Sequence, residues 1–398
     1  MSKIINASVV TSLNMHMKPN ELIDLGNQHR EQRLPEQALA CYAQAFVQDR
    51  TNAAAFNNYG NVLREVGDPA GAIPFLERAL TLEPRYTTAK FNIAVCQLLL
   101  GDYKHGWASY ESRWEYEHLA GTLPKFEQPR WQGEPLKDKT ILVIGEQGHG
   151  DTVQFVRFVQ QLIDAGANVL LQVTAGLVSV FQPGGGVAKV GTYTDDLGPF
   201  DYWTPIMSIP RILGITLDNL PRQLSYISAD SALVAQWAKR LGFKNKMRVG
   251  FGWSGRRDSW LNGHKGMPFN KMIDIIKRNP DYNWINLQAD ATDEENQTLT
   301  DLGVTVFPGT VSGFADTAAL MMHLDIVLSV DTVTAHLAGS LGRPTWIMLN
   351  DYAVDWRWLL GRNSTPWYPS AVLFRQEKMD DWESVIRDVT KHLGWAKI

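Results

Sequence analysis

Three residues beside a short apolar run have the types and spacing to bind a phosphate. Asp331 and Thr332 follow the run Leu324 to Val330, and His336 lies one helical turn further on, in DTVTAHLAGSLGRP. The run resembles a buried parallel strand, and the pattern after it indicates a helix. Because a helix start offers free N–H donors and a partial positive charge, this junction could hold an anion. A helix N-cap worth about 1 kcal/mol would explain Asp331 or Thr332 more simply, but not His336.

A second set of candidates lies in the glycine-rich loop GEQGHGD, residues 145–151. Gly148 and Gly150 allow a ligand close to the backbone, and His149 between them either faces solvent or flanks an acceptor. Asp151 would project into a crevice above the sheet from the start of the next helix, although taken alone it is better explained as an N-cap. The glycine spacing matches neither GxGxxG nor a Walker loop, which disfavours a dinucleotide site.

Lys265 and the turn Ser254-Gly255 complete the candidate chemistry. Both follow the strand expected at 249–253, and ligands of open α/β sheets bind beyond the carboxyl ends of the strands. Lys265, which by itself would be a surface lysine, could neutralise a leaving diphosphate together with the helix start. Asp151 on an opposing half could act as general base on an acceptor hydroxyl. The sequence has no metal-binding motif, so neither a metal nor another cofactor is expected. It also has no GxSxG elbow, which weakens the alternative of a Ser-His-Asp hydrolase.

The sequence predicts two α/β halves that would bring these residues together across a cleft. The first half, residues 140–245, opens with a βαβ unit. In the second half, residues 246–379, strands alternate with helices, which favours a parallel sheet. A final helix is expected within residues 380–398. The expected strands are 140–145, 168–173, 249–253, 284–288, 304–307, the run ending at 330, and 345–349, and the expected helices are 152–164, 268–278, 293–302, 315–323 and 380–393.

The first third of the chain, residues 20–114, repeats every 34 positions, which is the tetratricopeptide period. Three units are near the minimum for a stable array. Asn58 and Asn92 share one phase of the repeat and could pair with the backbone of an extended peptide, although ordinary polar helix positions explain them equally well. Small residues recur where paired helices would touch: Gly26, Gly60 and Ala94, then Ala38, Ala72 and Gly106. A proline-rich connector is expected at 115–139.

Composition favours a cytoplasmic protein. The net charge of −4 gives no global attraction to nucleic acid or anionic membranes. Cys41 and Cys96 are expected as reduced core thiols rather than a disulfide. No apolar run reaches the ~18 residues of a membrane span. Residues 1–18 lack the apolar core of a signal peptide and are interpreted as a frayed leader.

The motifs together resemble a known family. The GEQGHGD loop, the Trp253-Ser254-Gly255 turn, the Lys265-Gly-Met-Pro268 segment and the DTVTAHLAGSLGRP block are similar, in this order, to ADP-heptose-type glycosyltransferases. With the repeats, the chain from Glu21 onward resembles bacterial tetratricopeptide-repeat glycosyltransferases, which are related in arrangement to protein O-GlcNAc transferases. The resemblance implies a GT-B fold of two Rossmann-like halves, a nucleotide-sugar donor, inversion at the anomeric carbon and no required metal.

The resemblance also implies roles for individual residues. Asp151 matches the acceptor-activating base, and Lys265 matches the basic residue at the donor phosphate. Asp331, Thr332 and His336 match the block at the donor diphosphate and sugar. Two further residues, Ser254 and Gly255, are expected to line the donor side. The acceptor side is expected to be lined by Gly148, His149 and Gly150. Where many relatives have an Asn-Arg-Ser-Ile-Pro-type segment, this chain has residues 264–268 as HKGMP, so sugar selection is expected to differ.

Several acceptors remain open. The main hypothesis is a protein hydroxyl, with the protein held by the repeats through Asn58 and Asn92. The alternative is transfer to lipopolysaccharide or another glycan, with the repeats serving self-association into a homo-oligomer. A nucleic-acid acceptor is a remote third option because of the acidic balance. A non-catalytic scaffold that only binds a nucleotide is the fourth, and the retained Asp151, Lys265 and His336 count against it.

Overall fold

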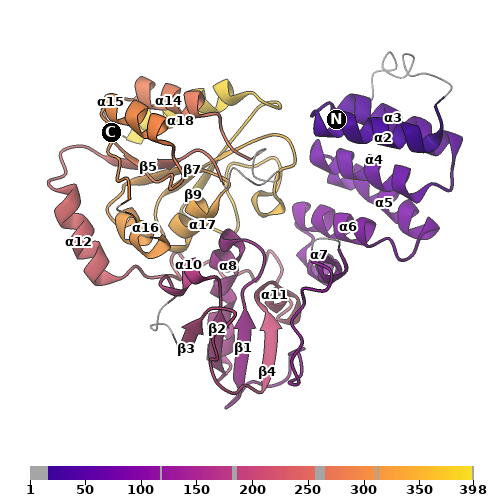
Figure 1. Ribbon diagram of the computed structural model, residues 1–398, viewed down its shortest axis with the longest axis horizontal. Helices are drawn as coiled ribbons and strands as arrows, with labels where there is room; N and C mark the ends of the chain where they lie inside the picture. Colours follow the sequence, from indigo (N-terminus) through magenta and orange to yellow (C-terminus); the bar gives the residue numbers. More distant parts are fainter. Residues whose placement is uncertain are drawn as a thin grey trace. The chain divides into compact units, whose positions relative to one another are not determined.

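The computed structural model describes residues 17–116, 119–181, 186–255, 265–309, 311 and 313–396. Most of the expected leader, as well as His264, lies outside these residues. The chain divides into two compact units, and Figure 1 traces both along the sequence. The first, here the helical unit, comprises Met1–Lys125, Ile215–Asp218 and Asp351–Gly361. The second, here the α/β unit, comprises Phe126–Gly214, Asn219–Asn350 and Arg362–Ile398.

The described part of the helical unit contains the repeat array in the form of consecutive antiparallel helix pairs. The helices are α2 (Pro19–Glu31), α3 (Pro35–Gln48), α4 (Ala53–Glu65), α5 (Pro69–Leu82), α6 (Thr87–Leu99) and α7 (Tyr103–Tyr110). Glycines stand where paired helices touch, as predicted. A Cβ at Gly26 would lie 2.5 Å from Cε1 of Tyr42, and one at Gly60 would lie 2.8 Å from Cγ of Leu76. The 34-residue spacing of small residues therefore reports the closest approach of the helices.

Cys41 and Cys96 are free and buried in this unit, as expected of core thiols. Burial raises the pKa of both thiols to about 11. At neutral pH both therefore remain in the unreactive thiol form.

The helical unit also holds a segment that the repeat pattern did not predict, Asp351–Gly361. This segment follows a strand of the α/β unit in the chain, and it contains the 3-10 helix η4 (Trp356–Trp358). The indole of Trp356 lies 5.3 Å from the ring of Trp107 and 6.3 Å from that of Tyr103. Trp356 is 3% exposed, so it is a core residue of the array rather than a sugar platform.

The α/β unit contains two parallel sheets (Figure 1). The first has the strand order β3-β2-β1-β4, and the second has the order β6-β5-β7-β8-β9. All described pairings are parallel, which agrees with the expected architecture of two Rossmann-like halves. The strands are β1 (Thr140–Ile144), β2 (Asn168–Gln172), β3 (Val187–Gly191), β4 (Tyr202–Pro205), β5 (Arg248–Gly252), β6 (Asn283–Asn286), β7 (Ile326–Val330), β8 (Thr345–Leu349) and β9 (Ala371–Arg375).

Helices cover both sheets. Those of the first half are α8 (His149–Phe155), η2 (Val156–Phe158), α9 (Val159–Asp164), α10 (Ala175–Val178), η3 (Ile206–Ser208) and α11 (Ile209–Ile212). Those of the second are α12 (Ser231–Leu241), α14 (Phe269–Arg278), α15 (Asp293–Asp301), α16 (Phe314–Met321), α17 (Val333–Ser340) and α18 (Trp382–Ala396). Apolar residues of α14, α15 and α18 form one core with β5 and β7, and this core fixes where the carboxyl ends of those strands lie.

The sequence-based predictions of some helices and strands were wrong. The strand expected at 304–307 is only a single bridge between Thr305 and Ile285, because its neighbours make no further ladder bonds in the described residues. The helix expected at 152–164 starts earlier, at His149, and is interrupted by the 3-10 turn η2. The short strands β3, β4 and β9 and the helix α12 were not predicted.

Candidate functional site

The glycine-rich loop after β1 leads directly into α8. The backbone N–H of Gly148 donates a 2.8 Å hydrogen bond to Oδ2 of Asp151. Asp151 stands in the first turn of α8, where its carboxylate accepts from the N–H of Gly148. Its negative charge also interacts favourably with the positive end of the helix dipole. The simpler interpretation was wrong in detail, because Gly148 is the N-cap of α8 and Asp151 is the third helical residue, whose carboxylate bonds back to the N-cap N–H. This bond fixes the carboxylate in the turn that follows β1.

Three of the predicted donor-side residues lie together at the carboxyl ends of β5 and β7. Nζ of Lys265 is 2.7 Å from Oδ2 of Asp331, and Nε2 of His336 is 3.8 Å from Oδ1 of the same carboxylate. Asp331 and His336 are buried, whereas the Lys265 side chain keeps 25% of its surface exposed. Lys265 is therefore the most solvent-exposed of these three side chains.

The buried carboxylate of this cluster is paired with a lysine. A carboxylate as buried as Asp331 needs an opposite charge, because desolvation of an unpaired ion is costly. Lys265 supplies that charge at 2.7 Å, and its ammonium group carries three N–H donors. A diphosphate arriving at Lys265 would share the ammonium group with Asp331.

Thr332 and the Ser254-Gly255 turn border the cluster. Thr332 is the N-cap residue of α17, and its hydroxyl lies 3.1 Å from that of Ser329 at the end of β7. The hydroxyl of Ser254 donates to the carbonyl of Gly255. Gln288 holds this turn, because its Oε1 accepts from the N–H of Ser254 at 3.1 Å and its Nε2 donates to the Ser254 carbonyl at 2.9 Å.

The two halves of the α/β unit meet where α8 packs on α17. A Cβ added at Gly150 would lie 2.7 Å from Cδ2 of His336, so only glycine fits there without displacement. His149 faces the ring of Phe314 at 5.0 Å and is not simply solvent-facing. The predicted acceptor loop and the predicted donor cluster are thereby brought into direct contact.

Sequence reasoning missed several polar residues at this junction. Nδ1 of His336 is 2.8 Å from the hydroxyl of Tyr368. The buried guanidinium of Arg157 donates to the carbonyl of Trp367 and to the hydroxyl of Tyr226. An arginine inside the apolar pattern Val153 to Phe158 was the only sequence signal for this cluster.

A cavity of about 80 Å³ adjoins the donor side. The side-chain amides of Asn286 and Gln288, at the carboxyl end of β6, form part of the cavity wall. The cavity is also bordered by Leu287, Ala289, Asn296, Phe307, Pro308, Gly309, Val311, Thr317 and Leu320. Gln288 links this cavity to the Ser254-Gly255 turn through the hydrogen bonds described above.

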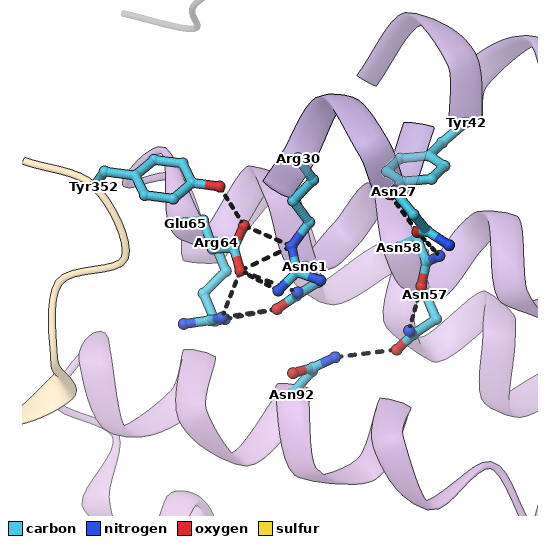
Figure 2. Close-up of polar contacts among 10 residues, drawn as sticks. All are labelled: Asn27, Arg30, Tyr42, Asn57, Asn58, Asn61, Arg64, Glu65, Asn92 and Tyr352. Atoms are coloured by element: carbon cyan, nitrogen blue, oxygen red, sulfur yellow. Dashed lines mark hydrogen bonds and ion pairs between the residues drawn. The ribbon is translucent and has the colours of Figure 1, made fainter. Parts of the chain in front are cut away.

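In the helical unit, the predicted peptide-binding asparagines bond to other asparagines. Nδ2 of Asn92 donates to Oδ1 of Asn57 at 3.1 Å, Asn57 donates to Asn58 at 3.0 Å, and Asn58 donates to Asn27 at 3.1 Å. Figure 2 shows this asparagine chain running across α2, α4 and α6. A peptide bound here would compete with these side-chain bonds.

Beside the asparagine chain lies a buried carboxylate, Glu65 (Figure 2). Arg30 donates to it from Nε at 2.9 Å and from a terminal nitrogen at 2.6 Å, and Tyr352 donates its hydroxyl at 2.7 Å. Burial alone would raise the pKa of Glu65, but the hydrogen bonds and charge of Arg30, with Arg64 and Tyr352, outweigh it and hold that pKa below its usual value. The segment Asp351–Gly361 is also held through its backbone, because the N–H of Ala353 donates to the main-chain carbonyl of Glu65.

Two features are absent from the part of the chain that the structure describes. The described residues contain no group of three or more His, Cys, Asp or Glu side chains arranged to hold a metal ion. Within the same residues, no helix combines the length and apolar character required to traverse a bilayer.

Comparison with known proteins identifies the repeats. Residues 23–86 and 60–105 match the family model described as tetratricopeptide repeat. The chain is also similar to Protein FlbA of Caulobacter vibrioides, with 26% identity over 432 residues that cover 92% of this chain and 71% of that protein.

Two solved structures are similar to about two thirds of the chain. The crystal structure of the glycosyl transferase family 9 from Veillonella parvula has 11% identity and a TM-score of 0.49, covering 66% of this chain and 97% of its own. The E. coli ADP-heptose lps heptosyltransferase II has 13% identity and a TM-score of 0.47, covering 65% of this chain and 100% of its own.

Proposed function

We propose that this chain is a tetratricopeptide-repeat glycosyltransferase that moves a sugar from a nucleotide-sugar donor to a hydroxyl of a macromolecular acceptor. The observation that carries the proposal is the cluster of Lys265, Asp331 and His336, which lies at the ends of two parallel strands and against Gly150 of the opposing half. Ligands of parallel α/β sheets bind at such strand ends. The ordered motifs that resemble ADP-heptose-type glycosyltransferases assign a sugar diphosphate to this position.

On the donor side, Lys265 contacts the diphosphate. Its exposed ammonium donates to phosphate oxygens, while Asp331 holds it from behind at 2.7 Å. His336 lies beside Asp331, with Nε2 3.8 Å from Oδ1 of that carboxylate. Together with the start of α17 at Thr332, these groups neutralise the charge that develops on the leaving diphosphate.

We place one edge of the donor's base, rather than the whole nucleoside, at the cavity of about 80 Å³ beside Gln288. Its wall carries amide groups of Asn286 and Gln288, which donate and accept hydrogen bonds as base edges require. It is linked to Lys265 through the turn, because a Cβ at Gly266 would lie 3.4 Å from that of Ser254. A diphosphate at Lys265 therefore leaves its nucleoside within reach of this cavity.

On the acceptor side, Asp151 serves as the general base. It takes the proton of the acceptor hydroxyl, the acceptor oxygen bonds to the anomeric carbon, and the bond from that carbon to the phosphate oxygen breaks. Attack from the face opposite the diphosphate inverts the configuration. The bond from Gly148 N–H orients the carboxylate for this step.

For the acceptor we favour a protein. The tetratricopeptide repeats carry a continuous row of amide side chains, including Asn58 and Asn92, and an extended chain can exchange these bonds for bonds to its backbone. A glycan acceptor is the competing candidate, with the repeats serving self-association. The internal bonding of the asparagines favours it, because a peptide would first have to displace those bonds.

A donor screen with a transfer assay tests the proposal. Nucleoside diphosphates of adenine, uracil, guanine and cytosine, and their sugars, are added to the full chain, and the melting temperature is recorded. The binding donor is then supplied with candidate proteins or glycans, and transfer is measured by mass spectrometry. The proposal fails if no nucleoside diphosphate or nucleotide sugar stabilises the protein.

A further inference from the structure

The ring of His336 is fixed from three sides, and only two of them belong to the predicted site. Asp331 faces Nε2 at 3.8 Å, and the backbone of Gly150 closes over Cδ2. The third side is the hydroxyl of Tyr368, which lies 2.8 Å from Nδ1. A histidine in neutral form carries its proton on one nitrogen only, and the partner of the other nitrogen decides which.

Tyr368 is itself held rigidly. Its side chain lies against the backbone of α17, where a Cβ at Gly339 would come within 2.5 Å of Cδ1 of the ring. Tyr368 is 1% exposed, so its hydroxyl is anchored in a region where an unsatisfied polar group would be costly. The bond to His336 satisfies that need.

A buried arginine from the first half of the α/β unit completes the support. The guanidinium of Arg157 lies 5.0 Å from the ring centre of Tyr368 and 4.4 Å from that of Tyr226. It donates to the carbonyl of Trp367, the residue before Tyr368, at 2.7 Å. A buried cation stacked on aromatic faces is stabilised without a carboxylate. The orientation of Tyr368 thus depends on a residue of the opposite half.

We propose that Tyr368 is the positioning residue of His336: its hydroxyl at Nδ1 holds the imidazole so that Nε2 faces Asp331, the carboxylate that pairs with Lys265. This role rests on the proposed function, because it matters for catalysis only if Lys265 contacts a donor. The same role exists in the free protein, since all four side chains are already in place there.

The first test uses Tyr368→Phe and observes His336 in the free protein by nitrogen-15 NMR of the imidazoles. The two neutral tautomers and the cation give different ring-nitrogen shifts, and loss of one of the nine histidine signals in His336→Gln assigns the resonance. The matched control is Tyr282→Phe, which removes another buried hydroxyl, one that donates to the carbonyl of Leu393.

The expected result is a change in the His336 shifts and in their pH dependence in Tyr368→Phe, with no change in Tyr282→Phe. Unchanged His336 shifts in Tyr368→Phe would overturn the proposal. Equal changes in both variants would also overturn it, because they would reflect general loosening of the core.

The second test measures calorimetric affinity for the nucleoside diphosphate found in the donor screen. Tyr368→Phe should weaken binding about three- to tenfold, the scale of one hydrogen bond, and should have no further effect in the His336→Gln background. An additive effect in the double variant would contradict positioning through His336. If the NMR shifts respond but no nucleoside diphosphate binds, the proposed function fails while the link between Tyr368 and His336 stands.

Discussion

Replacing Glu65 by Gln should loosen the helical unit around the segment Asp351–Gly361. The substitution keeps the shape of the side chain but removes the charge that receives three hydrogen bonds from Arg30 and one from Tyr352. Breaking a fully buried ion pair costs about 3–5 kcal/mol. Because the Arg30 side chain remains 30% exposed, solvent screening lowers the expected loss to about 2–3 kcal/mol.

Hydrogen exchange read by mass spectrometry measures this loss locally. Amides of α4 and of residues 351–361 should exchange about 30- to 150-fold faster in Glu65→Gln. This factor corresponds to a loss of about 2–3 kcal/mol in the free energy of local opening. The matched control is Glu77→Gln on the exposed face of α5, which should leave exchange unchanged. Unaltered protection of both peptides in Glu65→Gln would refute the claim that the carboxylate holds the segment.

Acid should remove the same contribution. The pKa of Glu65 is lower in the folded chain than the usual value of about 4.3, so the ionised carboxylate stabilises the fold above that pH. The stability gap between the wild type and Glu65→Gln should be complete above about pH 5 and shrink as the pH falls below about 4 through the folded pKa. A gap that is constant down to pH 3 would show that the charge is not responsible.

Three further predictions concern the site. Asp151→Asn should remove sugar transfer while leaving nucleotide affinity nearly intact in calorimetry, and unchanged turnover would reject the base assignment. Gly150→Ala should cost about 1–3 kcal/mol in thermal or urea unfolding, because the new Cβ would lie 2.7 Å from His336; full stability would mean that α8 can move away from it. Deleting residues 1–114 should abolish modification of the acceptor and expose Trp356, with slow donor hydrolysis retained; transfer at the full rate would exclude the repeats as the docking surface.

Patterns within one element were predicted well from the sequence. The 34-residue period located the helix pairs, because small residues at Gly26 and Gly60 are required wherever Tyr42 and Leu76 pack closely. The strand before Asp331 was recognised for a similar reason, since a strand buried on both faces has a continuous apolar run.

Short and partly exposed elements were missed. β3 and β9 have mixed burial, so no single period marks them. The contacts of Tyr352 with Glu65 and of Tyr368 with His336 join residues 287 and 32 positions apart. Only folding brings such pairs together, and neither tyrosine carries a local signal for its partner.

The central claim is that Lys265 receives the diphosphate of a nucleotide-sugar donor, and calorimetric titration with the best nucleoside diphosphate tests it most directly. The comparison is between the wild type, Lys265→Ala and the control Lys277→Ala on the exposed side of α14. The account predicts that Lys265→Ala loses about 1.5–3 kcal/mol of binding free energy, the value of a charged hydrogen bond, while Lys277→Ala binds like the wild type. Equal affinity of all three proteins would contradict it.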